Sequence, residues 1–139
     1  MSVSVTTVEH REQLSQADGL SVRLALREEL IAISVYLHIS NSEAWFLDRV
    51  LDLAEAGPGN VFSQGAGENF DNPGDLTVEQ AQDIVDVFDS MTAEDIRALV
   101  ADADDTADAD EQIDGGVELL GDALNVLRHA RERGGLSVR

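Results

Sequence analysis

The sequence has no cysteine and no lysine, and it contains only two prolines, one tryptophan and one tyrosine. Without cysteine the chain can form no disulfide and can do no thiol chemistry. No run of apolar residues approaches the roughly 18 that a membrane-spanning helix needs. The first residues also lack the basic stretch and apolar stretch of a secretory signal. From these absences we expect no membrane association and a cytoplasmic location.

What the sequence has in excess is negative charge. Twenty-eight acidic residues face nine basic ones, all of them Arg, so the formal net charge of the 139 residues is −19. Residues 68–122 hold eighteen of the acids and a single Arg, which places −17 of that charge in one stretch. Such a chain repels nucleic acid and anionic membranes unless its few Arg cluster. We therefore expect no direct binding of DNA or RNA.

The acidity has two interpretations, and the sequence leaves both open. A salt-adapted or GC-rich source would place Asp and Arg on a solvated surface, which is the more economical interpretation because net charge bears on solubility rather than on fold. Alternatively, an acidic face binds a basic protein partner, for example by imitating a nucleic-acid backbone. The residues that we assign to such a partner-binding face are Asp83, Asp86, Asp89, Asp102, Asp104, Asp105, Asp108 and Asp110.

Helical patterns dominate the chain. Between Leu76 and Val100, apolar residues recur at helical spacing in two successive segments. Thr77 and Gln80 form a capping box at the start of the first segment, and Thr92 caps the second. Another capping box, Ser40 with Glu43, begins a helix whose apolar residues we expect in the core, namely Trp45, Phe46, Val50, Leu51 and Leu53.

Residues 31–39 fit two structures equally well, because Ile31 to Ile39 alternate as in a half-buried strand while a helical stripe also runs through to Leu37. Residues 2–8 and 136–138 favour short strands that can pair with each other, and a last helix is predicted over 117–133. The prediction is a mostly helical α+β fold, a single domain over residues 1–139 with four to five helices and a small sheet pairing the N- and C-terminal strands.

Two segments interrupt the helical patterns. Residues 57–75 contain five Gly and both prolines, and a loop of this length in a compact domain is often functional. Residues 101–116 form an acidic, low-complexity segment of Asp and Ala that we expect to be solvated.

No catalytic or metal-binding motif is complete. An EF-hand loop needs oxygen ligands at positions 1, 3, 5 and 12 and Gly at position 6, and the frames that start at Asp102 or Asp104 fail at positions 6 and 12. None of His10, His38 and His129 lies three residues after a Glu, as a di-iron site requires, and we expect His10 at the surface. The segment 65–68 lacks the third glycine of a dinucleotide-binding loop. We expect no metal, no cofactor and no catalytic residue.

The order of features resembles the YfbM-like family, small bacterial proteins assigned to a domain of unknown function. The similar segments are Leu37–Ile39 continuing to Trp45 and Leu51, then 76–84, 91–96 and 133–138. His38 stands where the family has Asp, and the aromatic or His that follows the Trp in the family is missing. The resemblance implies an α+β fold and supplies no settled activity.

We favour a non-enzymatic binding protein of the immunity, inhibitor or antagonist type, whose acidic face engages a basic protein. The alternative is a small-molecule binder or an enzyme that uses the Gly-rich loop beside Trp45. The sequence leaves the partner and the oligomeric state open.

Overall fold

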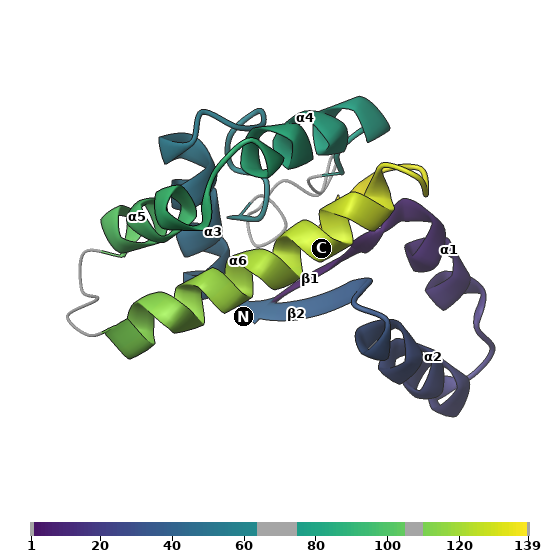
Figure 1. Ribbon diagram of the computed structural model, residues 1–139. Helices are drawn as coiled ribbons and strands as arrows, with labels where there is room; N and C mark the ends of the chain where they lie inside the picture. The colour runs from purple at the N-terminus through teal and green to yellow at the C-terminus, as the bar shows by residue number, and fades with distance from the viewer. Residues whose placement is uncertain (1, 64–74, 105–109, 139) are drawn as a thin grey trace.

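The computed structural model describes residues 2–63, 75–104 and 110–138 (Figure 1). Within these residues the chain has the mostly helical α+β fold that the sequence predicts. The elements follow in the order β1 (Ser2–Thr7), α1 (Val8–Gln16), α2 (Leu20–Ala32), β2 (Tyr36–Ser40), α3 (Asn41–Leu53), α4 (Val78–Asp89), α5 (Ala93–Ala103), α6 (Asp110–Ala130) and β3 (Leu136–Val138).

The three strands form one antiparallel sheet in the order β2-β1-β3. Val5 on the central strand lies opposite Leu37 on one side and Val138 on the other, so the N- and C-terminal strands pair as predicted. The ambiguous residues 31–39 divide between two elements. Helix α2 ends at Ala32, Ser34 adopts a left-handed φ of 62°, and the strand follows. The Thr6 hydroxyl of β1 donates to the Val35 carbonyl at 2.6 Å and holds this bend against the sheet.

Helix α6 is the centre of the packing. It runs across the sheet, with α3, α4 and α5 gathered over one part of its length and α1 and α2 beyond the sheet (Figure 1). It contacts α4, α5 and all three strands, and α3 contacts α5, β1 and β2. The core beneath these helices is continuous and includes Val3, Val5, Leu47, Ile84 and Leu127, all of which are fully buried.

The predicted capping boxes are confirmed at Ser40 and Thr77, and Thr92 caps α5 in the same way together with Asp95. The prediction for the last helix was too short, because α6 begins at Asp110 rather than near Val117. Ile113 and Val117 pack against the core, and this burial outweighs the low helix propensity of the two glycines between them.

The prediction that Trp45 and Leu53 belong to the core is wrong. The Trp45 side chain is 61% exposed and that of Leu53 is 46% exposed. Helix α3 instead buries the face that carries Ala44, Leu47 and Leu51, and Trp45 lies about a third of a turn away from the centre of that face.

No helix among the described residues has the length and apolar character needed to cross a membrane.

Candidate protein-binding face and adjoining pocket

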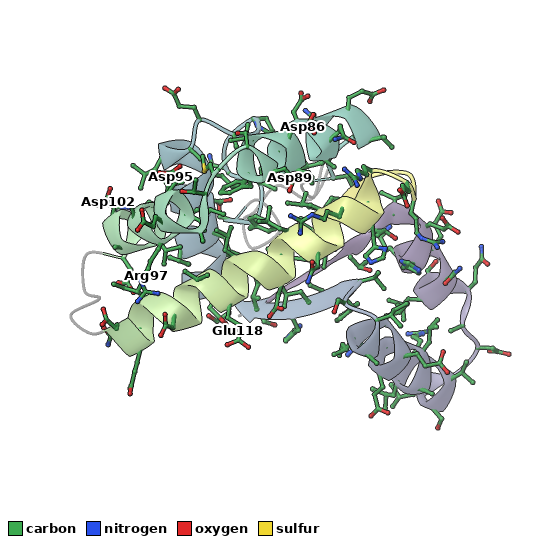
Figure 2. The ribbon with its side chains drawn as sticks, in the orientation of Figure 1. Asp86, Asp89, Asp95, Arg97, Asp102 and Glu118 are labelled. Carbon is green, nitrogen blue, oxygen red and sulfur yellow. The ribbon has the colours of Figure 1, made fainter. Side chains whose placement is uncertain are left out.

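The acidic residues of α4, α5 and the part of α6 up to Asp122 are exposed, and Figure 2 labels several of them. On α4 the apolar residues Ala81, Ile84, Val85 and Phe88 face the core, which leaves the carboxylates on the opposite side. We call the exposed carboxylates of these three helices the acidic surface: Glu79, Asp83, Asp86, Asp89, Glu94, Asp95, Asp102, Asp110, Glu111, Asp114, Glu118 and Asp122.

The structure divides the predicted partner-binding residues into two groups. Asp83, Asp86 and Asp89 share α4, whereas Asp102 and Asp104 lie at the end of α5 and Asp110 begins α6. Asp105 and Asp108 lie outside the described residues.

Some of these carboxylates already have partners within the chain. Asp89 accepts a hydrogen bond from Arg128 Nη2 at 2.9 Å, and Asp86 accepts one from Gln82 Nε2 at 2.6 Å. Exposed pairs of this kind contribute at most about 1 kcal/mol. A carboxylate also accepts several hydrogen bonds, so both residues can still meet a cation from outside.

Arg97 is the one basic residue between positions 68 and 122. Its guanidinium donates to the carboxylate of Asp114, and Nη2 lies 3.6 Å from Oδ1 of Asp110. The hydrogen bond from Arg97 to Asp114 raises the pKa of Arg97 above its ordinary value, and the nearby charge of Asp110 acts in the same direction. Arg97 thus forms ion pairs between α5 and the first turns of α6.

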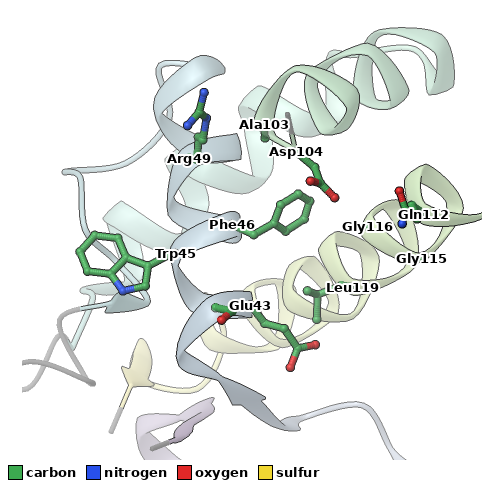
Figure 3. A pocket seen from close by; sticks show the side chains of 11 residues that line it. Glu43, Trp45, Phe46, Arg49, Ala103, Asp104, Gln112, Gly115, Gly116 and Leu119 are labelled. Carbon is green, nitrogen blue, oxygen red and sulfur yellow. The ribbon is translucent and has the colours of Figure 1, made fainter. Parts of the chain in front are cut away.

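A pocket of about 530 Å³ lies between α3, α5 and α6, next to the acidic surface (Figure 3). Phe46 and Leu119 supply apolar lining, and Glu43, Arg49 and Asp104 supply charged groups. Figure 3 shows the Phe46 ring projecting between α5 and α6, with the Asp104 carboxylate on the same side of α3. The pocket therefore combines an aromatic wall with a polar edge, as binding sites commonly do.

Gly116 allows the helices around this pocket to approach closely. A Cβ atom at that position would lie 2.6 Å from Val100 Cγ1 and 3.0 Å from Phe46 Cζ. Because real carbon contacts are longer, a side chain at Gly116 would have to displace Val100 and Phe46.

The sequence did not identify this pocket, since Trp45 and Phe46 were both expected in the core. Trp45 lines the pocket but projects away from Phe46, on the other side of α3 (Figure 3). A signal was present in the spacing of Ala44, Leu47 and Leu51, which define one helical face that excludes Trp45.

The described part of the predicted Gly-rich loop, residues 57–63, does not line the pocket beside Trp45. Gly57 and Pro58 instead border a smaller pocket of about 260 Å³ against α4, which Asp83 also lines. Val61 and Phe62 are buried and anchor this segment to the core.

Within the part of the chain that the structure describes, no three His, Asp or Glu side chains are grouped so that they could hold a metal ion. Comparison with family models, with curated proteins and with solved structures found no match to this chain. The resemblance to the YfbM-like family therefore stays a prediction.

Proposed function

We propose that this chain is a non-enzymatic binding protein that engages a basic protein partner through the acidic surface. The observation that carries the proposal is the exposure of twelve carboxylates on three adjoining helices, in a stretch whose one Arg is already paired with Asp110 and Asp114. An immunity protein, a toxin inhibitor or an antagonist of a nucleic-acid enzyme would use such a surface.

The physical basis is electrostatic steering with an apolar anchor. A surface of one sign speeds the encounter with a partner of the opposite sign, and this effect weakens as salt rises. Charge alone gives little net affinity, whereas a buried apolar or aromatic contact often dominates an interface. The pocket walled by Phe46 and Leu119 supplies such a contact beside Asp104.

The test is capture of a partner by the tagged protein at the native ionic strength of its host, followed by identification and titration of the purified partner over a salt series. A surface variant replaces five exposed carboxylates of the acidic surface: Asp83→Asn, Asp86→Asn, Asp102→Asn, Glu111→Gln and Glu118→Gln. A control variant changes the net charge equally but outside the acidic surface: Glu12→Gln, Asp18→Asn, Glu29→Gln, Asp52→Asn and Glu132→Gln.

We expect one basic partner whose affinity falls with salt and is lost in the surface variant only. Equal binding by both variants, or no specific basic partner at native ionic strength, would overturn the proposal. The acidic residues would then serve only to keep the surface hydrated.

The pocket favours a second candidate, the binding of a small molecule, with or without catalysis. Its volume of about 530 Å³ lies in the range of small-molecule sites, and Trp45 at its edge is the only tryptophan in the chain. Trp45 fluorescence therefore reports on ligand binding without labelling. A ligand that shifts this emission in the wild type but not in Phe46→Ala, with the surface variant unaffected, would favour this candidate over a protein partner.

A further inference from the structure

Helix α2 leaves most of its apolar side chains in solvent. Among the described residues eight large hydrophobic side chains are exposed, and five of them fall between positions 20 and 33: Leu20, Val22, Leu24, Ile31 and Ile33. A group of exposed apolar residues on one element of a folded domain marks an interaction surface more often than scattered single residues do.

The exposed residues of α2 include a regular stripe. At 100° per residue, Leu20, Leu24, Arg27 and Ile31 fall within a sector of about 60°. Leu26 and Leu30 lie on another side of the helix, roughly 90–130° from the centre of the stripe. They pack with Leu14, Val35 and Tyr36 in a small cluster separate from the main core. Leu26 and Leu30 are thus covered within the chain, whereas Leu20 and Leu24 are exposed. Ile31 is also exposed, and it borders a small pocket with Asp122 and Val126 of α6.

The charge on α2 favours a second copy of this chain over a strongly charged partner. The helix carries Arg23, Arg27, Glu28 and Glu29, so its net charge is zero in a chain of −19. Two copies of so acidic a chain repel each other over most of their surface, and α2 lies away from α4 and α5 (Figure 1). A strongly charged partner of either sign would gain little attraction there, whereas a second copy meets no net repulsion from the helix.

The two flanks of the stripe are also complementary to each other. Arg23 borders it on one side and Glu28 on the other, five residues later. In a parallel pair of helices, residues with this spacing meet across the interface and form ion pairs that fix the orientation. Arg27 lies on the stripe itself, but its guanidinium carbon lies 5.5 Å from the centroid of the Tyr36 ring, and this cation–π contact draws its charge toward the sheet.

We propose that two copies of this chain associate through α2 in a parallel, two-fold symmetric pair. Leu20, Leu24 and Ile31 pack against their equivalents, and Arg23 pairs with Glu28 of the second copy on both sides. The association is weak because α2 spans only residues 20–32. It strengthens as salt rises, since salt screens the repulsion between the two acidic chains. Binding of a basic partner to the acidic surface should instead weaken as salt rises. Failure of one proposal therefore does not decide the other.

The test is sedimentation velocity of the wild type and variants over a wide concentration range at low and high NaCl. Leu24→Asp has a matched control in Leu53→Asp, because the two side chains are equally exposed at 46% and lie on different helices. Both substitutions are at the surface, and circular dichroism checks that the fold is kept. We expect Leu24→Asp to weaken dimerisation about tenfold or more, since it buries an unpaired charge, and Leu53→Asp to leave it unchanged.

Charge exchange tests the orientation. Arg23→Glu and Glu28→Arg should each weaken the dimer, while the double variant keeps the wild-type net charge and should restore it. A wild type that stays monomeric at every protein and salt concentration would overturn the proposal. The exposed stripe of α2 would then bind something other than a second copy. Equal loss in Leu24→Asp and Leu53→Asp would overturn it as well, and failure of the double variant to recover would overturn the parallel arrangement.

Discussion

The buried carboxylate of Asp48 accepts a hydrogen bond from the backbone N–H of Phe62 at 2.8 Å. Its other oxygen accepts one from the N–H of Ser63 at 2.9 Å, so both oxygens of a residue that is only 3% exposed are satisfied. Hydrogen bonds to a charged acceptor are about twice as strong as neutral ones, and they offset the cost of burying the charge. This pair of bonds fixes the start of the Gly-rich segment against α3.

Replacing Asp48 should destabilise the protein through the loss of these bonds. We expect Asp48→Ala to lower the free energy of unfolding by about 3 kcal/mol, because two buried backbone donors lose their acceptor. Asp48→Asn keeps one acceptor oxygen and should cost less. Urea unfolding measures both, and the exposed Asp52→Ala on the same helix is the control for the change of charge. Equal stability of the Asp48 and Asp52 variants would contradict this role.

Asp48 also illustrates what the sequence can and cannot predict. Ser40 and Glu43, or Thr77 and Gln80, act within one turn of a helix, so a capping box is visible in four consecutive residues. The partners of Asp48 lie fourteen and fifteen residues away in an irregular segment, and no local pattern specifies that contact. The same distinction applies to the pocket, which depends on how α3, α5 and α6 meet rather than on any motif.

The charge of the candidate site was predictable, whereas its shape was not. Asp83, Asp86 and Asp102 are exposed because each lies opposite an apolar helical stripe, and the stripe is visible in the sequence. The close approach at Gly116 and the outward position of Trp45 follow from tertiary packing. The sequence therefore indicated an acidic surface without indicating the pocket beside it.

Gly135 should tolerate no side chain. Its φ is +110°, and a Cβ atom there would lie 2.1 Å from the carbonyl oxygen of Leu76, which accepts from the N–H of Leu136 at 3.0 Å. We expect Gly135→Ala to destabilise the fold by about 3 kcal/mol or more, because the strain of a left-handed residue is added to a backbone clash.

Gly19 provides the matched comparison for Gly135. Its φ is +91°, but a Cβ atom there would have no neighbour within 4 Å. Gly19→Ala should therefore cost only the backbone strain, about 1–3 kcal/mol, because φ +91° with ψ 158° is a conformation that almost only glycine adopts. Thermal unfolding of the two variants separates strain from clash, and similar melting temperatures would mean that the contact with Leu76 relaxes freely.

Two adjacent glycines of α6 should respond in opposite directions to the same substitution. A Cβ atom at Gly115 would point into open space, with nothing within 4 Å, so Gly115→Ala should stabilise the helix by about 0.5–1 kcal/mol. Gly116→Ala should instead destabilise the protein by about 1–2 kcal/mol, because the new methyl group displaces Val100 and Phe46. Chemical denaturation measures the sign of each effect. Stabilisation by both substitutions would show that α6 is not closely packed at Gly116.

His10 is buried, and the prediction that it lies at the surface is wrong. It lies in the first turn of α1, and Nδ1 is 2.7 Å from the Thr7 hydroxyl oxygen. Burial lowers the pKa of His10 below its ordinary value of 6.5; the positive charge of Arg133 and the proximity of His129 lower it further, and Glu9 opposes them. At pH 7 and above, the His10 ring is therefore neutral in the folded protein.

This lowered pKa makes stability depend on pH. Above pH about 6.5 the ring is neutral in the folded and the unfolded state, and its contribution to the free energy of unfolding is fully present. As the pH falls below this value, the unfolded chain takes up the proton first. The free energy of unfolding therefore decreases until the pH reaches the lowered pKa of the folded state. His10→Gln has no such proton, so the stability difference between wild type and variant should shrink from pH about 7.5 to about 5. Urea unfolding at the two pH values measures this stability difference.

NMR titration of the His10 ring should give a pKa below 6.5 that rises in Arg133→Gln, because removing the guanidinium removes a repulsion. A stability difference that is independent of pH, or a ring pKa that does not respond to Arg133, would exclude this account of His10.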